Sequence, residues 1–173
     1  MDDPQEVQGS SRSPSRARRW RLGAVAAALA LAVLGSSAWA GADRLVGHRP
    51  LNPPDAPQAI GPYSQGISTG QMVFVSGQLP IDPSTGQLLA DAPVEEQTRQ
   101  VLRNVRAVLA ADHLEMAQVV STTVYLSDLA DFERFNAAYA EFFTEGAPPA
   151  RATVQVVRVP KDAKVEISAI AVR

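Results

Sequence analysis

The sequence predicts an α+β domain in which one mixed sheet carries two helices on one of its faces. Short runs rich in β-branched and aromatic residues predict the strands. Two longer stretches, with apolar residues every three to four positions, predict the helices. The predicted order is strands, a helix, a strand, a second helix and two final strands. At 173 residues, the chain has little room for a second domain.

The first forty residues are predicted to be a signal peptide or a weak membrane anchor. The basic stretch 16–21 precedes an uninterrupted apolar run from Leu22 to Leu34, and Ala38-Trp39-Ala40 follows. This order is typical of a secretory signal and predicts cleavage after Ala40. The run is shorter than the roughly 20 residues that usually span a bilayer, so an uncleaved anchor would be weak. Either interpretation predicts an exported domain, periplasmic or secreted, that touches a membrane only through this segment.

Residues 41–57 are predicted to be a linker, and residues 58–173 form the predicted domain. The linker contains four prolines and little periodicity, which favours a semi-extended chain. Within the domain, residues 72–76 are β-branched or aromatic and predict a strand that ends at Gly77. Residues 82–86, Asp-Pro-Ser-Thr-Gly, predict a turn.

The first helix is predicted to begin at Pro93, with Glu95 and Glu96 in the first turn, where carboxylates suit the helix dipole. Its apolar stripe recurs at helical spacing and consists of Thr98, Val101, Leu102, Val105, Val108 and Leu109. Residues 119–126 are rich in β-branched residues and predict the next strand.

The second helix is predicted to be capped by Asp128 or Asp131 and to end before Gly146. Its stripe consists of Phe132, Phe135, Tyr139, Phe142 and Phe143. Two further strands are predicted at 152–159 and 165–172. Because helices cover only one face of the sheet, we expect a homo-oligomer to cover the other.

Composition excludes several kinds of chemistry. The chain has no cysteine, and its two histidines are far apart in the sequence, so a metal site, thiolate catalysis and disulfides have no support. No phosphate-binding loop and no nucleophile elbow is present. Residues 41–173 hold 11 basic and 15 acidic side chains, a net charge of −4, which disfavours a nucleic-acid partner. No cofactor is expected.

Three polar residues stand where the pattern predicts strands or a buried helix face. Arg151 opens a strand and is either a surface ion-pair residue or a two-pronged donor for a substrate carboxylate. Glu166 lies inside the last strand and is either an edge charge, a structural partner of Arg151 or a general base. Asn136 lies in the apolar stripe and is most simply a core amide that bonds the backbone.

Together these segments resemble the Rid/YjgF family of reactive-intermediate deaminases, and within it the RidA subfamily. The matching stretches are Ala59-Ile-Gly-Pro-Tyr-Ser-Gln-Gly66, Ser76-Gly-Gln-Leu-Pro80, Asp82-Pro-Ser-Thr-Gly86, Thr122-Thr-Val-Tyr-Leu-Ser-Asp-Leu129, Phe135-Asn136 with Ala140-Glu-Phe-Phe143, Pro149-Ala-Arg151, and Pro160-Lys-Asp with Val165-Glu-Ile-Ser-Ala-Ile-Ala171. They follow in order over nearly all of residues 56–173. Each stretch is weak alone, and their joint order is specific.

The resemblance implies a chorismate-mutase-like fold that assembles as a barrel-cored homotrimer, with active sites between subunits. It implies hydrolysis of enamines and imines, such as 2-aminoacrylate, to 2-keto acids and ammonia without a cofactor. By position, Arg151 would clamp the substrate carboxylate and Glu166 would activate water. The residues expected to line the pocket are Tyr63, Ser76, Gly77, Asn136 and Thr153, the last standing where many members have cysteine.

Three alternatives remain open at this level. The same fold could be a non-catalytic module that binds small carboxylates. Relatives described as ribonucleases that inhibit translation point to RNA, which the acidic domain and its lack of a basic stripe disfavour. A holdase-like chaperone would need a large exposed apolar patch, which a sequence does not reveal.

Overall fold

A computed structural model describes residues 47–173. Its strands are β1 (Arg49–Leu51), β2 (Gly66–Ser68), β3 (Met72–Gln78), β4 (Val119–Leu126), β5 (Ala150–Gln155) and β6 (Val165–Val172). Its helices are α2 (Val94–Ala110) and α3 (Phe132–Ala140), with short 3-10 turns at Met116–Gln118, Leu129–Asp131 and Pro160–Asp162. The predicted order of elements is confirmed from β3 onward.

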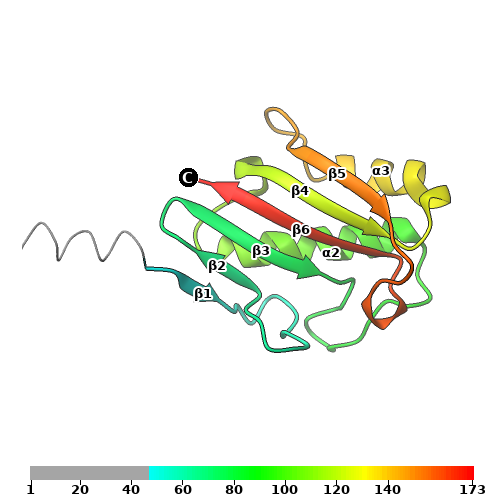
Figure 1. Ribbon diagram of the computed structural model, residues 1–173, viewed down its shortest axis with the longest axis horizontal. Helices are drawn as coiled ribbons and strands as arrows, with labels where there is room; N and C mark the ends of the chain where they lie inside the picture. The colour runs from blue at the N-terminus through cyan, green and yellow to red at the C-terminus, as the bar shows by residue number, and fades with distance from the viewer. Residues whose placement is uncertain (1–46) are drawn as a thin grey trace, which may run out of the picture. The chain divides into compact units, whose positions relative to one another are not determined.

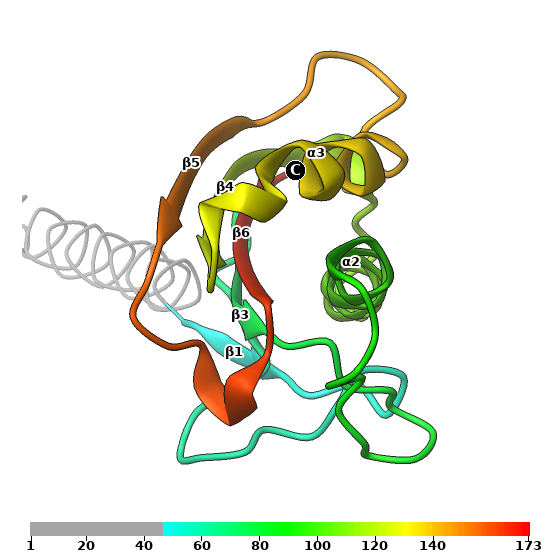
Figure 2. The same ribbon diagram turned by 90° about the vertical axis from the view of Figure 1, so that its right-hand side faces the viewer.

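The six strands form one sheet in the order β1-β2-β3-β6-β4-β5 (Figure 1). All neighbouring strands are antiparallel except β4 and β5, which are parallel, so the sheet is mixed. Figure 2 shows α2 and α3 on the same face of the curved sheet. The α+β class with two helices on one face is confirmed.

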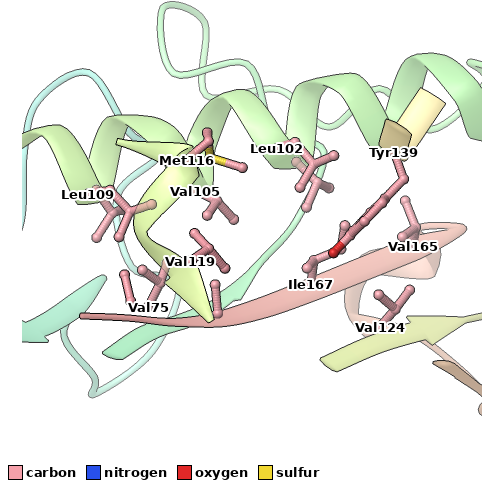
Figure 3. Packing of buried hydrophobic residues seen from close by; sticks show 14 of the residues in the cluster. Val75, Leu102, Val105, Leu109, Met116, Val119, Val124, Tyr139, Val165 and Ile167 are labelled. Carbon is pink, nitrogen blue, oxygen red and sulfur yellow. The ribbon is translucent and has the colours of Figure 1, made fainter. Parts of the chain in front are cut away.

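The main core lies between the helices and the sheet (Figure 3). The helix α2 begins after Pro93, as predicted, and its apolar stripe is fully buried. Thr98 belongs to this stripe because its hydroxyl donates to the carbonyl of Val94 at 2.7 Å, which satisfies a polar group that is otherwise costly to bury. On the sheet side, alternate residues of β6 such as Val165 and Ile167 are fully buried.

The second helix is shorter than its apolar stripe predicted. Asp128 caps the 3-10 turn by accepting from the amide of Ala130 at 2.8 Å, and α3 proper begins at Phe132. The helix ends at Ala140, so Phe142 and Phe143 pack against the core from the segment that follows it. The aromatic pattern therefore identified core residues correctly but overestimated the helix.

Part of the predicted linker belongs to the sheet, which corrects the boundary at residue 58. Residues 49–51 form β1 at the sheet edge, and Leu51 is a core residue. Arg49 also forms an ion pair with the buried carboxylate of Asp112, at the end of α2. A three-residue strand that contains a proline gives almost no sequence signal, yet an edge strand tolerates the missing amide of Pro50.

The face of the sheet opposite the helices carries large apolar side chains that are exposed in this chain. Phe74, Val120 and Val154 are each at least 40% exposed on β3, β4 and β5. This agrees with the expectation that a further copy covers the face, and the homotrimer itself stays a prediction. Within residues 47–173, no helix is long and apolar enough to cross a membrane.

Candidate active site

One group of predicted residues lines a pocket beside β3 and β6. Its volume is about 280 Å³, and we call it the Glu166 pocket. A separate pocket of about 430 Å³, lined by the end of α2 and by residues 114–117 and 141–145, contains no predicted site residue. The Glu166 pocket is lined by Ile60, Tyr63, Ser76, Gly77, Leu79, Pro160 and Glu166. The structure therefore brings together Tyr63, Ser76, Gly77 and Glu166 of the predicted site residues.

A β-bulge shapes this pocket. Val75 pairs with Ala169 on β6 but Gln78 pairs with Ile167, so β3 has one more residue than β6 between these pairs. The bulge brings Gly77 against the Glu166 side chain. A Cβ on Gly77 would lie only 1.8 Å from Glu166 Oε1, so this position accepts only glycine without moving the carboxylate.

Glu166 has the electrostatics of a general base. Burial raises the pKa of its carboxyl above the ordinary value. Between residues 47 and 173, Glu166 has neither a hydrogen-bond donor nor an ion-pair partner within bonding distance. A half-buried carboxylate without a partner is available to accept a proton from water.

Ser76 and Tyr63 form the opposite wall of the pocket. The hydroxyl of Ser76 donates to the carbonyl of Ser64 at 2.7 Å, so only its lone pairs are available to a ligand. Tyr63 is 45% exposed, and its hydroxyl accepts from the amide of Ile60 at 3.2 Å. This wall is therefore held by two hydrogen bonds, one within the 60–63 turn and one between Ser64 and Ser76 of β3.

The other predicted residues form a separate group, which we call the Arg151 cluster: Asn136, Tyr139 and Arg151. Arg151 Nη2 donates to Asn136 Oδ1 at 2.7 Å, and its guanidinium lies 4.5 Å from the centre of the Tyr139 ring. Asn136 thus bonds a side chain, and the prediction of a backbone-bonding core amide is wrong. The cluster fixes the guanidinium, and no carboxylate of the described domain pairs with it.

Tyr139 supports this cluster from the core. Burial raises the pKa of its hydroxyl, and the hydrogen bond with Thr122 and the charge of Arg151 partly oppose that shift. Thr153 follows on the same strand as Arg151, two residues on, and so shares its face. Its hydroxyl is buried and has no hydrogen-bond partner in the described part of the chain.

Arg151 and Glu166 are not brought together within one chain. Arg151 is opposite Thr122 on β4, whereas Glu166 is opposite Tyr125 on the same strand. A separation of three residues turns side chains to opposite faces and moves them about 10 Å along the strands. The interpretation of Glu166 as a structural partner of Arg151 is therefore wrong.

Sequence reasoning did not select four residues that shape the two groups. Ile60, Leu79 and Pro160 line the Glu166 pocket, and Tyr139 stacks on Arg151. The first three lie within the stretches that match the family, so the only sequence signal for them was their closeness along the chain to Tyr63, Ser76 and Lys161. Tyr139 has none, because it fits the apolar stripe of a core helix.

Comparison with known proteins gives consistent matches over this domain. A family model described as Endoribonuclease L-PSP matches residues 53–173. The 2-iminobutanoate/2-iminopropanoate deaminase of Salmonella typhimurium is 52% identical over 121 residues, which cover 69% of this chain and 93% of that protein. The crystal structure of Escherichia coli TdcF with bound serine is 46% identical with a TM-score of 0.69, and covers 72% of this chain and 98% of that one.

The comparisons correct the prediction of a signal peptide and a periplasmic location. The matched 121 residues make up 93% of the Salmonella deaminase, so that relative has no room for a counterpart of a forty-residue leader. Residues 1–40, on which the prediction rested, lie outside the described residues.

A second solved structure shows the same relation. The YjgF gene product of Escherichia coli is 49% identical with a TM-score of 0.69, and covers 72% of this chain and 98% of that one. The family model spans more than half of the chain, and both relatives and solved structures agree with it. The chain belongs to the Rid/YjgF family and has the α+β fold of that family.

Proposed function

We propose that the protein hydrolyses small enamines and imines next to a carboxylate to 2-keto acids and ammonia. The observation that carries the proposal is the Glu166 carboxylate, which is half-buried against Gly77 and unpaired within the described domain. The names of relatives at about 50% identity, 2-iminobutanoate/2-iminopropanoate deaminases, support the same chemistry.

Arg151 is the proposed anchor for the substrate carboxylate. Asn136 occupies one amino group of the guanidinium, which leaves the remaining donors for a carboxylate. A guanidinium can hold a carboxylate through two parallel hydrogen bonds, and this fixes both position and orientation. The ring of Tyr139 beneath the guanidinium restricts it further.

Glu166 is the proposed proton acceptor. Water attacks the carbon of the protonated imine as Glu166 takes one of its protons, and the C=N π electrons move to nitrogen, which gives a carbinolamine with the new C–O bond. Glu166 then gives this proton to nitrogen. As the C–N bond breaks, Glu166 accepts the hydroxyl proton, so the C=O bond of the keto acid forms and ammonia leaves. The imine carbon beside a carboxylate is already electrophilic, so positioning supplies much of the acceleration and we propose no cofactor.

A complete site in this proposal needs two copies of the chain. Arg151 and Glu166 lie on opposite faces of the sheet, so the Arg151 cluster of one copy would face the Glu166 pocket of its neighbour. The exposed apolar side chains of the open sheet face give such copies a surface to bury. We propose the homotrimer as this assembly.

RNA cleavage is the second candidate, because the matching family model is described as an endoribonuclease. The net charge of −4 over residues 41–173 opposes binding to a polyanion. A binding module without turnover would keep the Arg151 anchor but would not need the unpaired Glu166 base.

The test compares wild type, Arg151→Ala, Arg151→Lys and Arg158→Ala. An amino-acid oxidase generates the imine, and keto-acid formation is followed in competition with semicarbazide, which traps the imine. Arg158 is the matched control because it lies three residues beyond the end of β5 and pairs with Asp162 at 2.7 Å, and neither residue lines the Glu166 pocket or belongs to the Arg151 cluster. We expect Arg151→Ala to lose roughly 100-fold or more of the activity and Arg151→Lys most of it.

Full activity in Arg151→Ala would contradict the site. No acceleration by wild type over several amino acids, together with carboxylate binding, would favour the binding module. Cleavage of RNA that Glu166→Gln abolishes would favour the endoribonuclease.

A further inference from the structure

Gln65 is a buried side chain next to the Glu166 pocket that the proposed mechanism does not use. It is 2% exposed and precedes β2 directly. Buried glutamines are uncommon, because both ends of the amide need hydrogen-bond partners. Its contacts therefore indicate what the side chain does.

Gln65 joins its own segment to two others, residues 52–57 and β3. Its amide nitrogen Nε2 donates to the carbonyls of Ala56, at 3.3 Å, and Pro57. Its backbone amide donates to Asn52 Oδ1 at 3.0 Å, and its backbone carbonyl accepts from the amide of Ser76 at 3.0 Å. One residue thus ties the segment after β1 to the bulged part of β3.

These bonds flank the 60–63 turn, which forms part of the Glu166 pocket, on both sides. The turn from Ile60 to Tyr63 closes on itself through the bond from the Ile60 amide to the Tyr63 hydroxyl. On its N-terminal side the turn is fixed through Pro57, whose carbonyl accepts a hydrogen bond from the Gln65 side chain. Toward the C-terminus it is fixed through Ser64, whose carbonyl accepts from Ser76, and through Gln65 itself.

The oxygen of the Gln65 side-chain amide, Oε1, is a second observation that concerns this part of the molecule. Gln65 Oε1 is buried and has no hydrogen-bond partner among residues 47–173. A hollow of about 10 Å³, lined by Gln65, Tyr63 and Gly77 among others, lies behind the pocket. Unsatisfied buried acceptors are rare in folded proteins, and a role in the function of the site is one explanation for them.

We propose that Gln65 is a positioning residue for the deamination, acting through the 60–63 turn. It sets the distance between Tyr63, which the turn carries, and Gly77 and Glu166 across the Glu166 pocket. This inference rests on the proposed function. The substrate and the attacking water meet between these residues, so a displaced turn lowers the rate of the chemical step more than it weakens substrate binding.

The first test uses Gln65→Met, which keeps the length and burial of the side chain but removes both donors. We expect kcat to fall about 10- to 100-fold while KM changes less than about threefold, because misplacement by about 1 Å costs rates of this order. The matched control is Gln97→Met. Gln97 is fully buried, donates to the backbone carbonyls of Leu89, Ala90 and Ala92, and accepts from the amide of Lys164 at 2.8 Å; none of these residues lines the pocket.

The second variant, Gln65→Glu, separates hydrogen bonding from shape. At neutral pH its carboxylate would face two carbonyl oxygens, so activity should fall at least as far as in Gln65→Met. A protonated carboxyl can donate one bond, so the ratio of the variant's kcat/KM to that of wild type should rise as pH falls. The same ratio for Gln65→Met should stay flat.

Hydrogen exchange of residues 59–64 tests the tether without any turnover. We expect faster exchange there in Gln65→Met and unchanged exchange in α2. Unchanged exchange in the turn, a kcat within twofold of wild type, or an equal loss of kcat in Gln97→Met would each overturn the inference. A wild-type protein without turnover would overturn the proposed function and with it the role of Gln65 in deamination, whereas faster exchange in Gln65→Met would still show that Gln65 holds the 60–63 turn.

Discussion

The two halves of the candidate site hold opposite charges in opposite ways. In the Glu166 pocket the carboxylate is half-buried, has no cation beside it in the described chain, and is fixed by close packing against Gly77. In the Arg151 cluster the guanidinium is exposed and is held by Asn136 and Tyr139, neither of which neutralises it. Each half therefore keeps its charge available, and the sheet between them prevents the two charges from pairing within one chain.

This difference predicts that the two halves fail differently. The Glu166 pocket depends on backbone geometry, on a bulge and on a glycine, so small changes in packing should affect the chemical step. The Arg151 cluster depends on side-chain contacts at the surface, so changes there should affect substrate binding as well.

The largest expected effect is that of Glu166→Gln, which keeps the shape of the side chain but removes the base. We expect kcat/KM to fall by roughly 10²- to 10⁴-fold. Because burial raises the pKa of Glu166, the rising limb of the wild-type pH profile should lie above the ordinary glutamate value of about 4.3. Glu133→Gln, at an exposed position on α3, is the control, and an equal loss there would contradict the assignment.

Mixing two inactive variants tests whether the halves come from different copies. Neither Arg151→Ala nor Glu166→Gln can form a complete site alone. After joint refolding, a cyclic oligomer with sites between subunits should regain about a quarter of the wild-type sites by random assortment. The recovered activity is measured against each variant refolded separately. If oligomers shown to contain both variants recover no activity, the proposal that Arg151 and Glu166 of one site come from different copies is contradicted.

A smaller effect is expected from Gly77→Ala. The new methyl group would displace the Glu166 carboxylate, since its Cβ position is 1.8 Å from Oε1, and we expect activity to fall about 10- to 100-fold. The control is Gly70→Ala, at a turn with φ of 87° and no atom near the new Cβ. This control should lose about 1 kcal/mol of stability and keep its activity. The reverse pattern would show that Gly77 serves folding rather than the site.

The smallest effect concerns stability. The folded-state pKa of Glu166 is raised, so its stabilising contribution is complete below the unfolded pKa and is lost as pH rises through the folded value. At neutral pH the charged form is therefore the disfavoured one in the fold. Glu166→Gln should stabilise the protein by about 0.5 kcal/mol at pH 7 and by less near pH 4. Thermal unfolding at the two pH values measures this, and destabilisation at pH 7 would contradict the stated environment of the carboxyl.

The sequence by itself determined the secondary structure of most of the domain and, through the family resemblance, selected the candidate site residues. The strands 119–126 and 165–172 match β4 and β6 because period-two burial of β-branched residues is a local signal. Helix α2 was predicted from an equally local stripe. Arg151 and Glu166 stood out because charges inside strands are unusual.

Tertiary structure alone decided how these residues are grouped. The side of the sheet that a residue faces depends on strand register, and the three-residue offset between Arg151 and Glu166 exists only once β5 and β6 have both paired with β4. The strand β1, with its proline, becomes a strand only by pairing with β2. The close approach of Gly77 to Glu166 requires the bulge in β3, and the role of Gln65 requires residues 52–57 and β3 to meet at its side chain and backbone. These are non-local contacts, and local sequence patterns carry no information about them.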